Sequence, residues 1–309
     1  MLSVKWFYLL LISFLLGTSA CTIESAHVPE NRELIIASNY LTLSDTILFT
    51  SYEKTEKVEI TLMCLTTEQI LNRLNNMEAS ANIDLLLLNS LGDVNKFNKE
   101  GVLHPTDYSY MAPEALNSYA SNQYNYLGFG IDPFILSYDK GGKNTIFTYN
   151  DLTRHPFQNC VEHGDLPILL APTLEKLKKV DGNNWIKKFM AYSTDCGNCS
   201  DSLNLPVLSK YSYFVEQNSQ QHDFIFPSRN TTGCFYDLRA ACIVNQASNY
   251  SEAKFFVFHL TKEEVNIVWN EHMHTLSAFS TNTNFRKYQT RSSRLIPYYS
   301  MIERVLSKL

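Results

Sequence analysis

Four consecutive leucines, Leu85 to Leu88, are the feature that most constrains the fold. A run of this kind has no polar face, so as a strand it must be covered on both sides, as the strands of parallel sheets are. The segment around it, Leu34 to Pro105, alternates short apolar runs with helical patterns in the order strand, loop, helix, strand, loop, helix. That order predicts an α/β fold, in which ligands bind at the carboxyl ends of the strands.

Size and charge limit the classes of protein that fit. A chain of 309 residues with 45% hydrophobic residues can bury the core of one large or two medium domains. The net charge is −5, and the sequence has no run of Lys and Arg of the kind that neutralises phosphates. These properties argue against a nucleic-acid-binding protein.

The N-terminal segment has the pattern of a secretory signal. Lys5 precedes the apolar run Trp6 to Leu16, and small residues then lead to Cys21. The run is shorter than a comfortable membrane span, so residues 1–20 are predicted to be a signal peptide, with an N-terminal anchor helix as the alternative. Cys21 stands where a bacterial lipoprotein is cut and acylated, and lipidation there stays open. We expect an exported, periplasmic protein, for which a lipid on Cys21 is the only candidate contact with the membrane.

Disulfides are expected because the chain carries six cysteines beyond Cys21 and is predicted to be exported. Proximity in sequence suggests two pairs and leaves a third: Cys234 with Cys242, Cys196 with Cys199, and Cys64 with Cys160. The spacing of Cys196 and Cys199 would also suit redox chemistry or zinc. A zinc site needs further ligands at suitable spacing, and none is nearby in the sequence.

Three segments decide how the second half of the chain folds. Leu127 to Tyr138 is apolar but contains Pro133, and since a proline marks an edge or a break, the chain is expected to pass into a second lobe there. Leu166 to Ala171 is predicted to be a buried strand, with Pro172–Thr173 as the turn before a helix. Leu203 to Phe214 is predicted to be strand or loop.

Several motifs follow one another in an order that resembles a known family. They are Glu68, Arg73 and Leu74 in a short helix, Ala81 to Asp84, Lys99 to Pro105, Tyr149 to Leu152, Asn183 to Trp185, Phe226 to Gly233, Ala247 to Ala253, and Phe258 to Leu260. Each motif is loose, but their order and spacing are similar to those of the periplasmic ferric-ion-binding proteins of ABC transporters. The resemblance covers residues 33 to 309.

The resemblance implies a two-lobed periplasmic-binding-protein fold of type II, which is an α/β fold. Each lobe would hold a mixed, mostly parallel sheet with flanking helices, and hinge strands would join the lobes. Residues 22–132 with 236–280 would form lobe 1, and residues 133–235 with 281–309 would form lobe 2. The implied function is to capture Fe3+ in the cleft, alone or with a synergistic anion, and to deliver it to a membrane permease. The chain would then be a monomeric binding protein and not an enzyme.

The resemblance also implies a set of metal ligands. Fe3+ is a hard cation, and tyrosine phenols suit it because the metal lowers their pKa enough to ionise them. The family carries two consecutive tyrosines, and here Tyr213 falls on one position and Ser212 on the other. Tyr211 would share a face with Tyr213 if the segment is extended. Tyr40 stands beside the family's usual His position, so the implied metal ligands are Tyr213, Tyr211 and Tyr40.

Further ligand-binding residues are expected in both lobes. Asn39 and Asn89 follow two first-lobe strands, and Ser212 lies in the second lobe. Thr173 would begin a helix whose N–H groups bind the anion, although it would also serve as an ordinary N-cap. Asp132 stands where the family has a hinge Arg, and this exchange makes the cleft more favourable for cations.

Two other functions stay open. Related proteins of the same architecture bind thiamine between aromatic side chains, so an organic cation such as thiamine or a polyamine is the alternative ligand. The aromatic residues that could form such a cage are Tyr40, Tyr211, Tyr213, Phe235 and Tyr236. An exported hydrolase is the alternative of a different class, but the sequence shows no Gly-x-Ser-x-Gly elbow and no recognisable nucleophile, base and acid set.

Overall fold

The computed structural model describes residues 32–76, 82–110, 119–121, 123, 125–141, 146–161, 165–177, 179–195, 205–217, 222–279, 287 and 295–308. The predicted signal peptide, Cys21 and the Cys196–Cys199 pair lie outside these residues. Residues 33–309 belong to one compact unit, and the account below concerns this unit.

Strands and helices alternate along most of the described chain. The strands are β1 Arg32–Ser38, β2 Val58–Cys64, β3 Leu85–Leu88, β4 Ala120–Ser121, β5 Tyr126–Asp139, β6 Phe157–Asn159, β7 Ser193–Asp195, β8 Val207–Lys210, β9 His222–Ile225, β10 Tyr236–Ile243 and β11 Leu276–Ser277. The α-helices are α2 Thr50–Glu56, α3 Thr67–Asn75, α4 Leu91–Lys99, α6 Leu166–Lys176, α7 Lys179–Tyr192, α8 Tyr211–Glu216, α9 Tyr250–Leu260, α10 Glu263–His272 and α11 Ile296–Leu306. Short 3₁₀ helices are η1 Leu43–Leu48, η2 Tyr108–Tyr110 and η3 Tyr149–Thr153.

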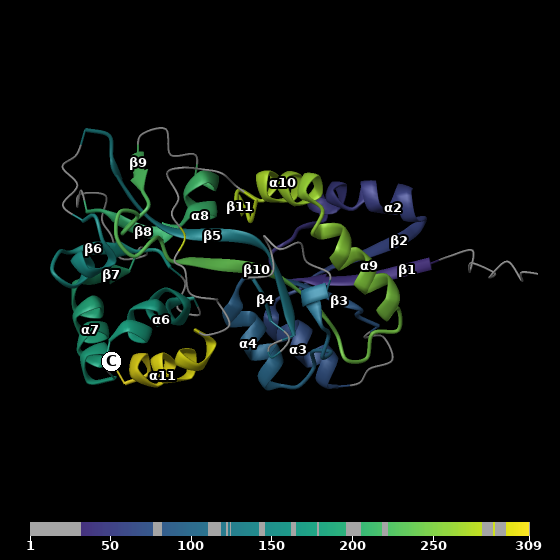
Figure 1. The fold of residues 1–309 in the computed structure, drawn as a ribbon, viewed down its shortest axis with the longest axis horizontal. Coiled ribbons are helices and arrows are strands. Elements are labelled where there is room, and N and C mark those ends of the chain that lie inside the picture. The colour runs from purple at the N-terminus through teal and green to yellow at the C-terminus, as the bar shows by residue number, and fades with distance from the viewer. Residues whose placement is uncertain are drawn as a thin grey trace, which may run out of the picture. The chain divides into compact units, whose positions relative to one another are not determined.

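The strands form two sheet regions that share β5 (Figure 1). In the first region the order is β2-β1-β3-β10-β5, and in the second it continues β5-β8-β6-β7. β1 pairs with β3 in parallel, and β6 pairs in parallel with both β7 and β8. β10 pairs antiparallel with β3 and β5, and β5 pairs antiparallel with β8. The predicted α/β class with mixed sheets and flanking helices is confirmed.

The long strand β5 changes partners at Pro133. Residues from Leu127 to Pro133 pair with β10, whereas Phe134 to Ser137 pair with β8. Proline has no N–H to donate, so it is tolerated where one ladder ends and another begins. The break that the sequence predicted here is therefore the point where the chain enters the second sheet.

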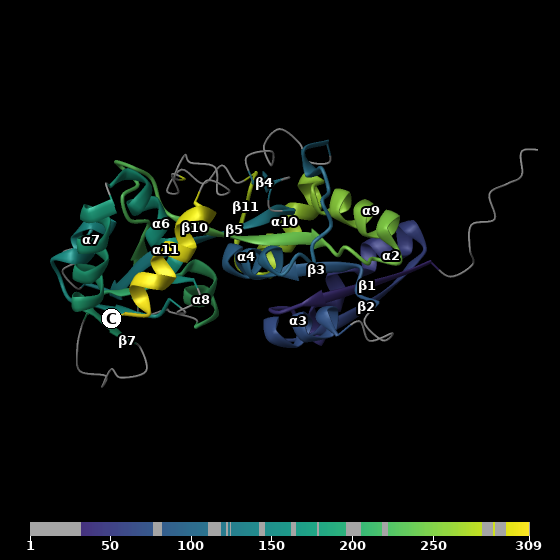
Figure 2. The same ribbon diagram turned by 90° about the horizontal axis from the view of Figure 1, so that it is seen from below.

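The leucine run forms β3, which is buried on both faces. Leu85 and Leu87 pack in one apolar cluster with residues of α2, α9 and α10. Leu86 and Leu88 point the other way and pack with residues of α3 and α4. Figures 1 and 2 show these helices on opposite faces of the first sheet. Since side chains alternate across a strand, four leucines fill two layers of core at once.

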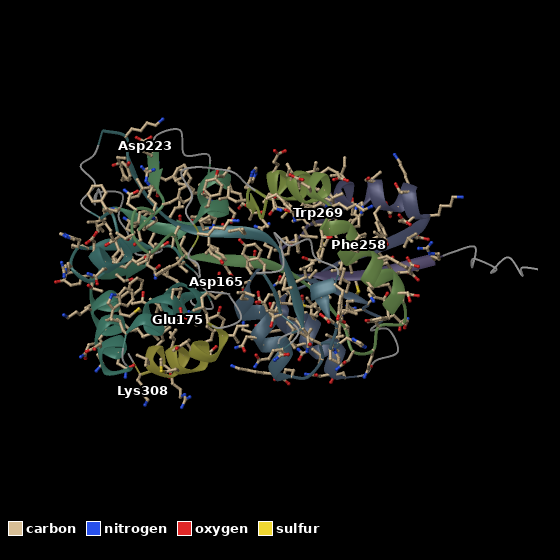
Figure 3. The ribbon with its side chains drawn as sticks, viewed as in Figure 1. Asp165, Glu175, Asp223, Phe258, Trp269 and Lys308 are labelled. Carbon is tan, nitrogen blue, oxygen red and sulfur yellow. The ribbon has the colours of Figure 1, made fainter. Side chains whose placement is uncertain are left out.

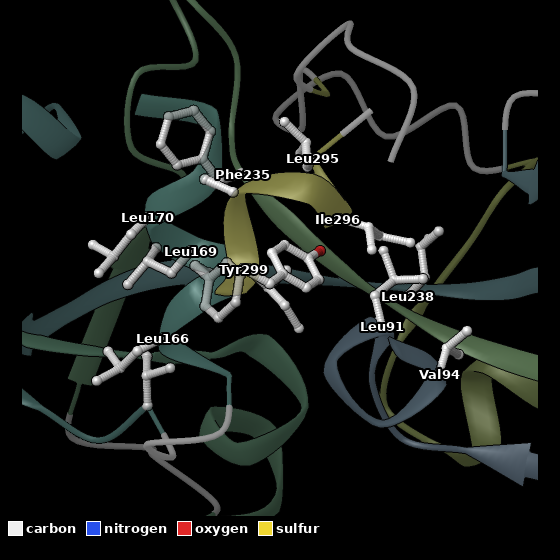
Figure 4. Packing of buried hydrophobic residues seen from close by; sticks show 14 of the residues in the cluster. Leu91, Val94, Leu166, Leu169, Leu170, Phe235, Leu238, Leu295, Ile296 and Tyr299 are labelled. Carbon is white, nitrogen blue, oxygen red and sulfur yellow. The ribbon is translucent and has the colours of Figure 1, made fainter. Parts of the chain in front are cut away.

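The second sheet is covered by α6, α7 and α11 (Figure 1). α6 and α11 pack against each other, and their leucines and Tyr299 belong to the same apolar cluster as Leu91 and Val94 of α4. Figure 4 shows this packing, in which Tyr299 lies among side chains from α6, α11 and Leu238 of β10. The C-terminal helix therefore ties the second-sheet helices to α4 beside the first sheet.

The prediction of a strand over Leu166–Ala171 is wrong, because these residues begin α6. A short apolar run fits a buried helix as well as a buried strand, and periodicity alone does not separate them. Pro167 lies in the first helical turn, where the missing N–H leaves no helical hydrogen bond unmade. Pro172 and Thr173 lie inside α6, so Thr173 does not begin a helix.

The cysteines that the structure describes do not form the predicted pairs. Cys64, Cys234 and Cys242 are free thiols, so the pairs Cys234–Cys242 and Cys64–Cys160 are wrong. Cys160 is disulfide-bonded. Cys234 and Cys242 are fully buried in the strands and loops around β10, where burial raises the pKa of both thiols.

None of the helices within the described ranges is long and apolar enough to span a membrane.

Candidate functional site

A pocket of about 410 Å3 lies where strands of both sheets end. β1 and β3 lead into it from the first sheet, and β6 and β8 lead into it from the second. Its lining residues are Asn39, Tyr40, Asn89, Arg239 and Met273 from the first side and Cys160, Val161, Asp165, Lys210, Ser212, Tyr213 and Glu216 from the second. This is the position at which α/β folds bind ligands.

Asp132 of β5 holds the start of α8. Its buried carboxylate accepts hydrogen bonds from the N–H of Ser212, at 3.0 Å, and from the hydroxyl of Ser212, at 2.6 Å. The first N–H groups of a helix have no partner within the helix, so Asp132 acts as a cap supplied by another strand. Asp132 itself does not line the pocket that the described residues form, and the Ser212 hydroxyl is committed to it.

Replacing Ser212 with alanine should destabilise the protein by about 1–3 kcal/mol, because the buried Asp132 carboxylate loses its hydroxyl donor. Urea denaturation measures the change. Ser251, an exposed serine in the first turn of α9, gives the matched control Ser251→Ala. Equal unfolding midpoints for the two variants would show that the Ser212 hydroxyl does not contribute to stability.

Lys210, the last residue of β8, links three parts of the fold. Its ammonium lies 2.6 Å from the carboxylate of Asp165, just before α6, and 2.8 Å from that of Asp237 in β10. Asp237 also accepts a hydrogen bond of 3.0 Å from the N–H of Leu91 at the start of α4. Burial by itself would lower the pKa of Lys210, but the carboxylates of Asp237, Asp165 and Asp132 raise it above its usual value. The lysine therefore stays charged at the base of the pocket (Asp165 is labelled in Figure 3).

The first-sheet wall carries a buried cation that is only partly satisfied. Arg239 of β10 is 4% exposed, and its guanidinium carbon lies 4.7 Å from the centre of the Tyr40 ring. Its Nε and Nη1 atoms have no hydrogen-bond partner in the described part of the chain. A buried, unpaired cation is costly, so a guanidinium in this setting favours a nearby anion.

The partly buried ring of Tyr40 lies under this guanidinium. Burial raises the pKa of its phenol well above the usual value, while Arg239 lowers it in part. The hydroxyl has no hydrogen-bond partner among the described residues. Tyr40 thus stays neutral until a bound cation offsets the burial.

Asn39 braces the pocket wall between β1 and β3. Its amide NH2 donates to the Thr67 hydroxyl, at 2.9 Å, and to the Asp93 carboxylate, at 2.8 Å. Its carbonyl oxygen accepts the N–H of Asn89, at 2.9 Å. Since its donors and its acceptor are engaged within the protein, Asn39 positions Asn89 at the pocket.

The structure brings most of the predicted site residues to this one pocket: Asn39, Tyr40, Asn89, Ser212 and Tyr213. Tyr213 is 45% exposed there. Tyr211 does not join it, because α8 is a helix and residues two apart on a helix face different sides. Its ring packs against those of Phe224, at 5.5 Å, and Phe226, at 6.2 Å. The expectation that Tyr211 and Tyr213 share a face is therefore wrong.

Thr173 lines a second pocket of about 340 Å3, away from the first. Its walls include Tyr149, Trp185 and Phe235, and it shares no lining residue with the first pocket. The rings of Tyr149 and Phe235 are stacked, with centroids 4.0 Å apart. The aromatic cage considered for an organic cation is therefore not assembled, since Phe235 lies here and Tyr211 packs with Phe224.

The charged residues of the pocket were not predicted. Arg239 had a usable signal, because a lone charge within the buried run Leu238–Ile243 is rare unless it is paired or functional. Lys210 and Asp165 are distant in sequence, so no local pattern pairs them. Glu216 lies three residues after Tyr213. This spacing places two residues on one face of a helix but not of a strand, so an extended segment did not predict that they are neighbours.

The pocket offers oxygen donors but no dense metal cluster. No group of three or more His, Cys, Asp or Glu side chains that could hold a metal occurs within the described ranges. The lining groups available to a hard cation are the phenols of Tyr40 and Tyr213, the carboxylate of Glu216 and the amide of Asn89. Such a cation would need further oxygen atoms from an anion or from water.

No family model matches the sequence, and no curated protein matches it either. Solved structures are similar to it along almost their whole length. A Trichodesmium protein, IdiA or FutA, solved with iron and citrate, has a TM-score of 0.77 and 16% identity, covering 89% of this chain and 98% of that one. Apo FutA2 from Synechocystis PCC6803 has a TM-score of 0.75 and 14% identity, with coverages of 90% and 98%.

A ferric binding protein from Campylobacter jejuni has a TM-score of 0.74 and 14% identity, covering 89% of this chain and 98% of that one. At these identities the likeness defines the fold. The chain has the two-lobed fold of periplasmic binding proteins, and within that class it has the fold of the ferric-binding proteins.

Proposed function

We propose that the protein is the solute-binding component of an ABC importer and that it captures ferric iron in the first pocket. The observation that carries the proposal is the pairing of groups around that pocket: the half-exposed phenol of Tyr213 on one side and the buried guanidinium of Arg239 on the other. Fe3+ ionises phenols and binds them as hard oxygen donors. Support also comes from the solved structures of the same fold, one of which holds iron and citrate.

The iron is proposed to bind together with an oxyanion. The protein supplies few oxygen donors, and Arg239 favours a negative charge beside Tyr40. A pocket of about 410 Å3 exceeds the volume of a bare ion and leaves room for a small carboxylate or carbonate. Thiamine and polyamines bring no anion to pair with this guanidinium, so they have less support as ligands.

Replacing Arg239 with glutamine should weaken the binding of Fe3+ offered with citrate by about 10–100-fold, because a charge-assisted interaction of about 1.5–3 kcal/mol is lost. Competition titration against a second chelator measures the affinity. Arg154, exposed at the end of η3, gives the control Arg154→Gln. Equal affinities for the two variants would contradict the proposed role of Arg239.

The hinge of the proposed binding protein would be formed by β5, which pairs with strands of both sheets, together with β10, which pairs with β5 as far as Pro133. Residues 22–132 with 236–280 and residues 133–235 with 281–309 remain the proposed lobes. Closing the lobes around iron would be a hinge motion, and the closed form would be the one that a permease recognises.

The proposed location rests on the sequence of the first residues. Residues 1–20 would direct export to the periplasm, and a lipid on Cys21 would be the anchor if the protein is retained at a membrane. The protein is proposed to act as a monomer and to perform no catalysis.

Native mass spectrometry with metal analysis of the protein as isolated tests the proposed function. We expect a mass increment that fits iron with a small oxyanion, and any acyl chain on Cys21 would be seen in the same spectrum. A mass increment that fits thiamine or a polyamine would show that the ligand is an organic cation and not iron. Hydrolysis of ester or phosphate substrates by the purified protein would contradict the absence of catalysis.

A further inference from the structure

α8 presents two oxygen-bearing side chains to the pocket on one face. Tyr213 and Glu216 are three residues apart, the spacing at which helical residues lie side by side. Both side chains are exposed and both line the pocket. Neither makes a hydrogen bond or ion pair with another described residue, so both are available to a ligand.

The direction of this face is fixed by the start of the helix. Asp132 binds both the N–H and the hydroxyl of Ser212, which turns that side chain toward β5. The residue directly before Tyr213 therefore supplies no oxygen to a cation. The next residue on the Tyr213 face is one helical turn later, at Glu216.

Most other polar side chains of the pocket are engaged elsewhere. The carboxylate of Asp165 is held by Lys210 at 2.6 Å. Asn39 makes its hydrogen bonds to Thr67, Asp93 and Asn89. Glu216 is thus the one carboxylate among the described lining residues that is free to bind a cation.

We infer that Glu216 is a metal ligand and that it forms, with Tyr213, a phenolate–carboxylate pair from a single helix. The inference rests on the proposed function and adds a residue to it. On binding, the Tyr213 phenol loses its proton to solvent, and the phenolate and the carboxylate together offset two of the three charges of Fe3+. A carboxylate is a hard donor that suits this cation. The last charge is left to the oxyanion beside Arg239.

The test compares Glu216→Gln with the wild type in a titration with ferric nitrilotriacetate. The variant keeps the size of the side chain and removes only its charge. We expect its affinity for Fe3+ to fall by at least about tenfold, since even changes beside a metal ligand reduce affinity by about 10–100-fold. The visible phenolate-to-iron absorbance band should remain, because Tyr213 is unchanged.

Two further variants make the result specific. Glu68→Gln removes an exposed charge from α3, outside the pocket, and should bind like the wild type. Glu216→Asp keeps a carboxylate and should retain more affinity than Glu216→Gln. If Glu216→Gln binds as tightly as the wild type while the wild type shows the band, Glu216 is not a ligand and the proposed function stands. If the wild type binds no Fe3+, the proposed function fails and this inference fails with it.

Discussion

Replacing Lys210 with methionine should lower the free energy of unfolding by about 3–5 kcal/mol, because two buried carboxylates lose their shared cation. Lys210 lies 2.6 Å from Asp165 and 2.8 Å from Asp237, and all three residues are buried. Methionine keeps most of the length of the side chain, so the variant removes the charge with little change in volume. Urea denaturation followed by circular dichroism measures the loss.

The control is Lys188→Met, which removes an exposed lysine from α7. This variant should unfold close to the wild-type midpoint. If Lys210→Met unfolds at the same urea concentration as the control, the three-residue network contributes nothing to stability. Lys210, Asp165 and Asp237 would then affect the charge of the pocket but not the stability of the fold.

Replacing Tyr213 with phenylalanine should abolish most of the visible phenolate-to-iron band and weaken Fe3+ binding by about 100-fold or more. Tyr213 is the half-exposed phenol of the pocket, whereas Tyr40 is partly buried and desolvation raises the pKa of its phenol. The hydroxyl of Tyr213 makes no hydrogen bond in the described part of the chain, so its removal should leave stability almost unchanged. Titration followed by absorbance and by melting temperature separates these effects.

Tyr110 offers a matched control, since it is 89% exposed in η2 and outside the pocket. Tyr110→Phe should keep both the band and the affinity. If the band is unchanged in Tyr213→Phe, the phenolate that binds iron comes from Tyr40 and not from Tyr213. The metal would then bind on the side of Tyr40 and Arg239, where the proposed function places the anion.

Much of the first sheet could be predicted from local patterns. The leucine run of β3 and the capping box of Thr66 and Gln69 are short-range signals, and the structure contains both. Pro133 marked the change of partners along β5 for an equally local reason. These elements agree with the sequence because burial pattern, capping and proline chemistry all act within a few residues.

The second sheet was harder to predict because its segments carry no periodicity. The run from Leu166 to Ala171 is apolar on all sides, and it forms the start of α6, which packs against α7 and α11. The start of α8 depends on Asp132, which is distant in sequence from Ser212. Predicting Tyr211 and Tyr213 on one face failed for this reason.

In the candidate site, too, local patterns predicted some residues, whereas contacts between distant segments were not predicted. Asn39, Tyr40 and Asn89 could be placed at a cleft because they follow predicted strand ends, whereas Tyr213 was placed there by the resemblance to the ferric-ion-binding proteins. Arg239 and Lys210 could not, because their partners Tyr40, Asp165 and Asp237 come from other parts of the chain. The buried guanidinium of Arg239 favours an anion, so of the two expected forms of the ligand it supports Fe3+ bound together with an anion.

The central claim is that this pocket binds Fe3+ through Tyr213, and titration of the purified protein with ferric citrate tests it most directly. Visible absorbance and melting temperature are recorded together. The proposed site predicts a phenolate-to-iron band that saturates at one iron per chain, with a parallel rise in melting temperature. A titration that shows neither the band nor the rise would contradict it.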